Sequence, residues 1–303
     1  MIVTRTHRSA RGAALVVAML LTALGAAVAV QMIVPLSGWL EREYRARDTQ
    51  ASYTLADASA AWALTVLAAD ARLGPVDHYG ELWATPLPAT PVEGGSIEGR
   101  ITDLQARFNL NSVAPRGVRS APNIALARTL FAQAGVPVGL VDALADSIDR
   151  DEISDDGQSE RQRYGRNLRN APLRRFADLL DVPGITEAHV SALMAAVTVL
   201  PEATPINANT AAPALIATAF PGATRETLDR AIARRAQQPF ASAGDLAAAI
   251  GQPLPDSMFS ANTQYFAVDA TIRFERAAHR VQLQIARPPN ARPIVISRLI
   301  SNA

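Results

Sequence analysis

Acidic side chains are densest between residues 146 and 160, and this segment offers the best candidate ligands for a metal ion. The carboxylates belong to Asp146, Asp149, Asp151, Glu152, Asp155, Asp156 and Glu160. Ca²⁺ takes several hard oxygen ligands at about 2.3–2.6 Å in a flexible geometry, which a loop rich in carboxylates can supply. The spacing is not that of an EF-hand, because the central glycine and closing glutamate of that loop do not line up. A solvated acidic loop, partly neutralised by Arg150, Arg161 and Arg163, fits the composition equally well.

The remaining reactive residue types give little support for catalysis. The chain has no cysteine, which excludes a disulfide, a thiolate metal site and a cysteine nucleophile. The four histidines are scattered and lack the spacing of a metal site or a catalytic triad. No glycine-rich phosphate loop is present. We therefore expect that the protein is not an enzyme.

Two proline-glycine turns, at residues 182–186 and 220–224, resemble helix-hairpin-helix turns, which can aim backbone N–H groups at a DNA phosphate. The second glycine expected of such a DNA-binding hairpin is replaced by Thr186 and Thr224. The net charge of +1 creates no overall attraction for nucleic acid. We expect the turns to be scaffold and no nucleic acid to bind. A membrane-tethered helix-hairpin-helix DNA-binding module remains the alternative function.

The N-terminus joins a basic segment to a long apolar one. Residues 13–40 carry no charge and are long enough to cross a bilayer core of about 30 Å as a helix. The basic residues before them would keep the N-terminus in the cytoplasm. Three interpretations fit this junction: a secretory signal peptide cleaved near Ala27-Val28-Ala29, a plain transmembrane anchor, or a short leader that ends at Gly12 and exposes Ala13 as the mature N-terminus.

Hydrophobic periodicity then predicts the elements that carry these residues. Apolar residues at three- and four-residue steps continue the N-terminal helix to about residue 72 as an amphipathic spine. Residues 74–95 are rich in proline and glycine and indicate a loop. Alternating residues predict one strand near 97–101 and a meander of three strands after residue 265, with helical segments between them. This order indicates an α+β fold with a helical insertion.

These boundaries give a predicted domain organisation. We expect a leader (1–12), an N-terminal helix (13–72, membrane half 13–40), an α/β domain (73–111 and 257–303), and an inserted helical domain (112–256) with subdomains of about 112–205 and 206–256.

Five segments, in this order, are similar to motifs of the type II secretion minor pseudopilin K family, also called the general secretion pathway protein K family. They are Arg11-Gly12-Ala13-Ala14-Leu15 at the family's processing site, residues 103–111, residues 146–151, Asn170-Ala171-Pro172-Leu173, and residues 206–211. The resemblance spans nearly the whole chain. Two departures fall in the acidic segment, where Ser147 replaces the family's tryptophan and Gly157-Gln158-Ser159-Glu160 replaces its Gly-Ala-Glu-Asp run.

The resemblance implies a pseudopilin fold: a long N-terminal transmembrane and spine helix, a small antiparallel sheet, and a large inserted helical domain of the helix-hairpin-helix or SAM-like type. It also implies cleavage after Gly12 by a prepilin peptidase, methylation of the Ala13 amine, and structural Ca²⁺ at the acidic segment. Val17 stands where most pilins carry a glutamate. A subunit without that carboxylate suits the top of an assembly, where no further subunit is recruited above it.

The function implied is that of a minor pseudopilin at the tip of the periplasmic pseudopilus, which supports protein export across the outer membrane. Its expected partners are the minor pseudopilins I and J, with H and the major pseudopilin as further candidates, the prepilin peptidase and the inner-membrane assembly platform. The expected location is the bacterial inner membrane, crossed once, with the C-terminal domain in the periplasm.

Overall fold

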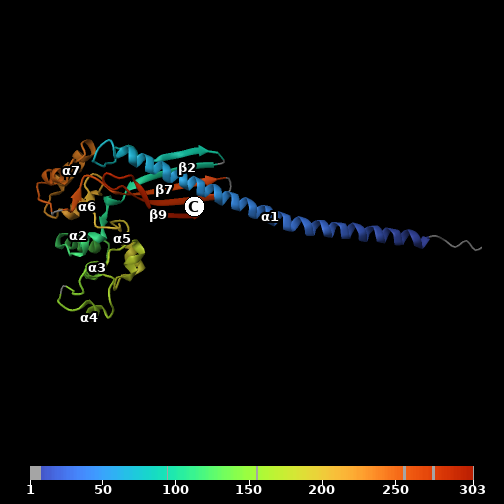
Figure 1. The fold of residues 1–303 in the computed structure, drawn as a ribbon, viewed down its shortest axis with the longest axis horizontal. Coiled ribbons are helices and arrows are strands. Elements are labelled where there is room, and N and C mark those ends of the chain that lie inside the picture. The colour runs from blue at the N-terminus through green and yellow to red at the C-terminus, as the bar shows by residue number, and fades with distance from the viewer. Residues whose placement is uncertain (1–7, 94, 155, 255–256, 275–276, 303) are drawn as a thin grey trace, which may run out of the picture.

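A single long helix dominates the shape of the protein (Figure 1). The computed structural model describes residues 8–93, 95–154, 156–254, 257–274 and 277–302, so residues 1–7 of the predicted leader lie outside the described residues. Helix α1 (Arg8–Asp70) is 63 residues long. Within the described residues, one segment, Ala14–Met32, is long and apolar enough to cross a membrane, with a mean hydropathy of 2.2. Its side chains are exposed, as expected for a segment that contacts lipid and not protein.

A five-stranded antiparallel sheet lies against the C-terminal part of α1. The strands follow the order β1 (Leu87–Val92), β2 (Gly95–Asp103), β7 (Tyr265–Phe274), β8 (Ala277–Ala286) and β9 (Ile294–Asn302). The register is regular across the centre, where Ala270 of β7 lies opposite both Gly99 of β2 and Val281 of β8. The predicted strand near 97–101 and the predicted C-terminal meander are therefore confirmed.

Strand β1 contradicts the prediction of a loop over residues 74–95. It contains Pro88 and Pro91, which lower the strand propensity of the segment. At the edge of a sheet, a residue whose N–H side faces solvent donates no hydrogen bond to a neighbouring strand, so proline is tolerated there. Strand β1 pairs with β2 alone, with a register irregularity between Leu87 and Thr90. The prolines of this segment therefore belong to an irregular edge strand and not to a loop.

The spine and the sheet share one hydrophobic core. Ala56, Ala63 and Leu67 of α1 are fully buried in a cluster with residues of β7 and β8, including Phe266. Trp83 also belongs to this cluster and packs edge-to-face on Phe266, with ring centroids 5.2 Å apart. Small alanines on the helix let it approach the sheet closely. The amphipathic half of α1 is thus an integral layer of the globular domain.

A helical region connects β2 to β7 and lies at the end of the sheet away from the free part of α1 (Figure 1). Its helices are α2 (Ala121–Gln133), α3 (Leu140–Ile148), α4 (Glu160–Tyr164), α5 (Glu187–Leu193), α6 (Pro213–Ala219), α7 (Arg225–Gln237) and α8 (Ala243–Ile250). They enclose a second hydrophobic core that includes Phe131, Leu144, Leu193, Ile216 and Phe240. The order of elements confirms the predicted α+β fold with a helical insertion.

Two short parallel strand pairs fasten this helical region: β3 (Phe108–Asn109) with β4 (Val197–Thr198), and β5 (Ile206–Asn207) with β6 (Phe259–Ser260). In each pair, the first strand ends at the first asparagine of an Asn-x-Asn motif, and both asparagine side chains of the motif are buried. Asn111 bonds the Leu173 backbone in both directions, at 2.8 Å each. Asn209 does the same to Phe240, at 3.0 and 2.8 Å. The two motifs are therefore equivalent cross-links between backbone segments that are distant in sequence.

Candidate metal centre

Three of the seven predicted acidic ligands converge in the structure. Asp146 and Asp149, at the C-terminal end of α3, and Glu160, the first residue of α4, each offer one carboxylate oxygen, and these atoms lie within 4.8 Å of one another. Asp146 and Asp149 are fully buried, and Glu160 is 2% exposed. Asp151, Glu152 and Asp156 are exposed, and Asp155 lies outside the described residues. The segment thus combines exposed carboxylates with a buried group of three, and metal binding by the predicted residues stays a prediction.

Local structure explains how residues 14 positions apart in the chain meet. Helix α3 ends at Ile148, and the chain turns back through Gly157, whose φ of +77° favours glycine. An isolated antiparallel bridge between Ile153 and Ser159 closes this loop. Ser159 then caps α4 by accepting a hydrogen bond from the Gln162 backbone. The cap places Glu160 in the first turn, facing the end of α3.

Several buried oxygens in this centre have no hydrogen-bond partner among the described residues. They are Oδ1 and Oδ2 of Asp149, Oε1 of Glu160 and Oδ1 of Asn170, which lines the same hollow as Glu160. A buried carboxylate oxygen without a partner is costly. Asp146 differs, because it accepts hydrogen bonds from Arg119 and from the Tyr164 hydroxyl, the latter at 2.6 Å. The unpartnered atoms are the oxygen ligands that a hard cation requires.

The protonation of the centre reflects this excess of buried negative charge. Burial, and then the carboxylates of Asp151, Glu160 and Asp146, raise the pKa of Asp149 to about 7, against the opposing charge of Arg119. Burial also raises the pKa of Glu160. Among the described ion pairs, Arg119 reaches two of the three buried carboxylates, Asp146 and, at 3.9 Å, Asp149. A divalent cation would balance the remaining charge.

The dimensions suit Ca²⁺. Two ligands on opposite sides of a Ca²⁺ ion are separated by about 4.6–5.2 Å, twice the Ca–O distance, so one ion can contact all three carboxylates. Glu160 and Asn170 also line a hollow of about 530 Å³ together with Glu152, which gives an ion access from solvent. The residues present therefore fit an oxygen-ligated structural cation.

The sequence analysis did not include Arg119, Tyr164 and Asn170 in the centre. Asn170 adopts a positive φ of +48°, and its Nδ2 donates to the Asp151 carbonyl at 2.5 Å. Asn170 belongs to the Asn170-Ala171-Pro172-Leu173 segment, which the sequence analysis named as a motif, and this was the one indication in the sequence that Asn170 could matter. Arg119 lies 27 residues from Asp146 and had no such signal.

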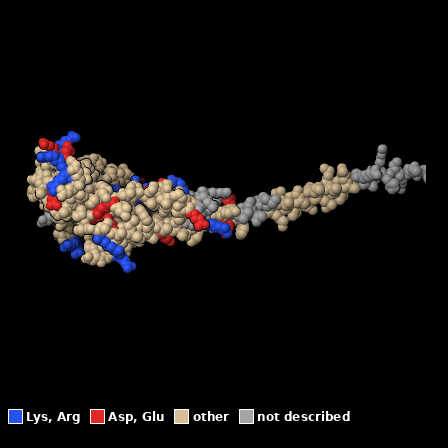
Figure 2. Space-filling view, turned by 90° about the horizontal axis from the view of Figure 1, so that it is seen from above, with Lys and Arg blue, Asp and Glu red and all other residues tan. Residues whose placement is uncertain are grey.

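Both proline-glycine turns lead into a helix that begins with a threonine cap. Thr186 and Thr224 are the N-caps of α5 and α7 and accept hydrogen bonds from the backbones of His189 and Thr227. Gly184 has a φ of +83°, and a Cβ there would lie 2.7 Å from Cδ2 of Leu140. Figure 2 shows arginine and acidic side chains interspersed over the visible face of the globular end. The threonines therefore have a capping role that a second glycine would not supply.

The other predicted site, Gly12 and Ala13, lies in the first turns of α1, where the structure describes the backbone alone. Cleavage and methylation at this site stay predictions. Val17, five residues beyond Gly12, is 55% exposed on the apolar part of the helix.

Comparison with known proteins assigns the family. Two family models, both described as type II secretion system protein K, match residues 106–202 and 206–269. The type II secretion system protein K of Pseudomonas aeruginosa is 32% identical over 228 residues, which are 67% of this chain and 66% of that protein. The protein of the same name from Klebsiella pneumoniae is 30% identical over 241 residues, 71% of each chain.

A solved structure shows the same fold. It is a chain of the GspK–GspI–GspJ complex from the type II secretion system of enterotoxigenic Escherichia coli. The match has a TM-score of 0.65 at 21% identity and covers 84% of this chain and 99% of that one. With two family models end to end across the helical region and relatives at about one-third identity, the chain belongs to the type II secretion system protein K family.

Proposed function

We propose that this chain is the minor pseudopilin at the tip of a periplasmic pseudopilus, where it supports protein export across the outer membrane. The observation that supports this proposal most directly is that α1 has an exposed apolar half and a half that is packed under the sheet. Residues 14–32 are exposed and apolar, while Ala56, Ala63 and Leu67 of the same helix are buried under the sheet. A rigid helix with one end in lipid and the other fixed in a globular domain is suited to lateral packing with like helices. The proposed role is assembly without catalysis.

Membership of the protein K family and the fold of a chain solved with GspI and GspJ support the minor pseudopilins I and J as partners. The minor pseudopilin H and the major pseudopilin would follow below them. The proposed location is the inner membrane, crossed once by α1, with the sheet and helical region in the periplasm. Before assembly, prepilin peptidase would cleave after Gly12 and the Ala13 amine would be methylated. The inner-membrane platform would then extract the helix. Val17 in place of a glutamate supports a terminal position.

We also propose that Ca²⁺ is a structural cofactor of the helical region. Asp146, Asp149 and Glu160 would hold it, and Ca²⁺ would supply the positive charge and the coordination that their buried oxygens lack. This would join the end of α3 to the start of α4 across an exposed loop.

The assembly role and the alternative DNA-binding role separate in one experiment. The full chain in detergent is mixed with its I and J partners, or with duplex DNA, at low and at moderate salt. We expect a salt-tolerant complex with I and J on gel filtration and no shift of DNA. Affinity for DNA that falls steeply with salt, without a partner complex, would refute the pseudopilin proposal, because release of counterions is typical of phosphate binding.

A further inference from the structure

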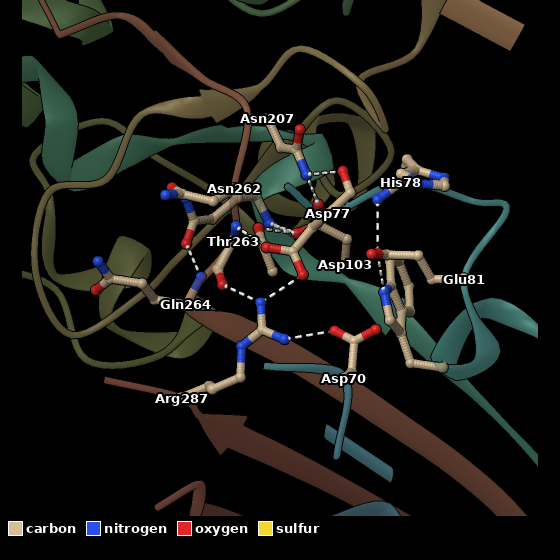
Figure 3. Close-up of polar contacts among 12 residues, drawn as sticks. Asp70, Asp77, His78, Glu81, Asp103, Asn207, Asn262, Thr263, Gln264 and Arg287 are labelled. Atoms are coloured by element: carbon tan, nitrogen blue, oxygen red, sulfur yellow. Dashed lines mark hydrogen bonds and ion pairs between the residues drawn. The ribbon is translucent and has the colours of Figure 1, made fainter. Parts of the chain in front are cut away.

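A second group of buried carboxylates lies where α1 meets the sheet and the helical region (Figure 3). It comprises Asp70, the last residue of α1, with Asp77 and Glu81 from the segment that follows. One oxygen of each lies within 4.8 Å of the others. Asp70 is 4% exposed and Asp77 is 2% exposed, while Glu81 is partly buried. This group is distinct from the acidic segment at 146–160.

Arg287 balances only part of this charge. Its guanidinium contacts Asp70 at 2.7 Å, contacts Asp77, and donates to the Thr263 carbonyl at 2.9 Å. Glu81 has no guanidinium contact among the described ion pairs; its Oε2 accepts from the His78 backbone at 2.9 Å and from Nε1 of Trp83 at 2.7 Å. Three carboxylates thus lie together at a mostly buried position, and the Arg287 guanidinium contacts only Asp70 and Asp77, which is unfavourable without further positive charge.

An unpartnered oxygen points into the group. Oδ1 of Asp70 is buried and has no hydrogen-bond partner among the described residues. Figure 3 shows it turned away from Arg287, on the side where Glu81 lies. Burial and the charge of Glu81 raise the pKa of Asp70 to about 6, which reports the same uncompensated charge. The arrangement repeats that of Asp146, Asp149 and Glu160, where Arg119 has the place of Arg287.

We propose that Asp70, Asp77 and Glu81 form a second divalent-cation site, of the Ca²⁺ type, at the junction of the spine with the globular domain. Carboxylate oxygens are ligands for hard cations, and the separation of these three oxygens spans one Ca²⁺ ion. A hollow of about 390 Å³, lined by Asp77, Thr263 and Arg287, lies next to one member of the group. Because the site has one unpartnered oxygen and a nearby guanidinium, it binds Ca²⁺ more weakly than the centre at Asp146, Asp149 and Glu160.

Trp83 allows binding at this site to be measured separately from binding at the other centre. Its indole donates to Glu81, so Tb³⁺ bound in place of Ca²⁺ at this site lies close to a tryptophan. At the other centre the aromatic neighbour is Tyr164, which bonds Asp146. The full chain in detergent, stripped with EGTA, is titrated with Tb³⁺ under excitation selective for tryptophan. We expect sensitised emission that Ca²⁺ displaces.

Variants then locate the signal. We expect Glu81→Gln to remove one bound Ca²⁺ per chain in equilibrium dialysis. The affinity of this site for Ca²⁺ should fall by at least about 10–100-fold, because loss of a residue that only supports a metal ligand already has an effect of that size. Trp83→Phe should remove the emission and keep the Ca²⁺ count. Glu98→Gln, on the exposed sheet face where Glu98 pairs with Arg273, is the matched control and should change neither. If Glu81→Gln does not fold by circular dichroism, Asp70→Asn gives the same test.

The proposal is wrong if tryptophan-sensitised emission is absent in the wild-type chain. It is equally wrong if the Ca²⁺ count is the same in the wild-type chain and in a folded Glu81→Gln or Asp70→Asn variant. In either case the carboxylates share a proton instead of an ion. Asp149→Asn, which perturbs the other centre, should leave the tryptophan-sensitised signal intact.

Discussion

Replacing Asp149 by asparagine should change stability in opposite directions with and without Ca²⁺. Asp149 is fully buried, and both its carboxylate oxygens lack hydrogen-bond partners among the described residues. Without Ca²⁺, ionising this group opposes folding, and asparagine removes the charge at nearly constant volume. With Ca²⁺, the same charge binds the ion. Asp149→Asn should therefore stabilise the Ca²⁺-free chain and remove the stabilisation that Ca²⁺ provides through this centre.

The magnitudes follow from the pKa of Asp149, which is raised from 3.8 to about 7. At about 1.4 kcal/mol per pKa unit, ionisation near pH 8 costs at most roughly 4 kcal/mol. The buried amide of asparagine costs about 1–3 kcal/mol in return. The variant should thus gain about 1–3 kcal/mol in EGTA. Free Ca²⁺ at about 100 times the Kd of this centre should stabilise the wild-type chain through it by about 2.7 kcal/mol, and the variant should lack this contribution.

The pH dependence has a definite sign. A carboxyl whose pKa is higher in the folded than in the unfolded state binds its proton more tightly when folded. Its contribution to stability is present below about pH 4 and is lost as the pH rises towards about 7. In EGTA, the free energy of unfolding of the wild-type chain should fall over this window, and Asp149→Asn should flatten the fall. Added Ca²⁺ should oppose it in the wild-type chain, because the ion competes with the proton.

Urea denaturation of the full chain in detergent, followed by circular dichroism, measures these differences at several pH values in EGTA and in Ca²⁺. Asp156→Asn is the matched control, since Asp156 is exposed and pairs with Arg163 at 3.1 Å. It should change the free energy of unfolding by less than about 1 kcal/mol in both conditions. A variant Asp149→Asn that is destabilised equally in EGTA and in Ca²⁺ would refute the reasoning and reduce Asp149 to an ordinary core contact.

Three further predictions test other parts of the structure. Gly12→Val should block processing, so intact mass should retain the leader, whereas a wild-type chain that starts near residue 30 would indicate an ordinary signal peptide. Leu67→Ala should destabilise the globular domain by about 2–5 kcal/mol in urea, because Leu67 is fully buried beneath the sheet; an unchanged midpoint would contradict a shared core. Asn111→Ala should cost about 1–3 kcal/mol in the same assay by leaving buried groups of Leu173 unpaired, and a neutral effect would contradict its cross-linking role.

Much of the fold was predictable because its patterns are local. Residues 266–273 alternate between buried and less buried side chains, and α1 shows the periodicity of a helix with one packing face. Strand β1 was missed because its two prolines lower strand propensity, while its position at an edge, which makes them acceptable, depends on the whole sheet.

The sequence indicated where carboxylates are dense but not which of them are buried together. Seven carboxylates formed the predicted ligand set, yet Asp151, Glu152 and Asp156 turn to solvent. The choice of Asp146, Asp149 and Glu160 depends on how the loop closes between α3 and α4. The group at Asp70, Asp77 and Glu81 was not predicted at all. Its distinguishing contact comes from Arg287, 217 residues from Asp70 in the chain, and no local pattern reveals that contact.

The two outer strands of the sheet have different consequences for self-association. Strand β1 contains two prolines and an irregular register, which make it a poor template for an added strand. Strand β9 is the opposite edge among the described residues and carries exposed Ile294, Ile296 and Leu299 without a proline. Accidental pairing of two copies would thus join β9 to β9. Such a contact is isologous and closes on itself, because neither copy then offers a second competent edge. The sheet is therefore protected against growth into open-ended fibres, although it is not protected against forming a pair.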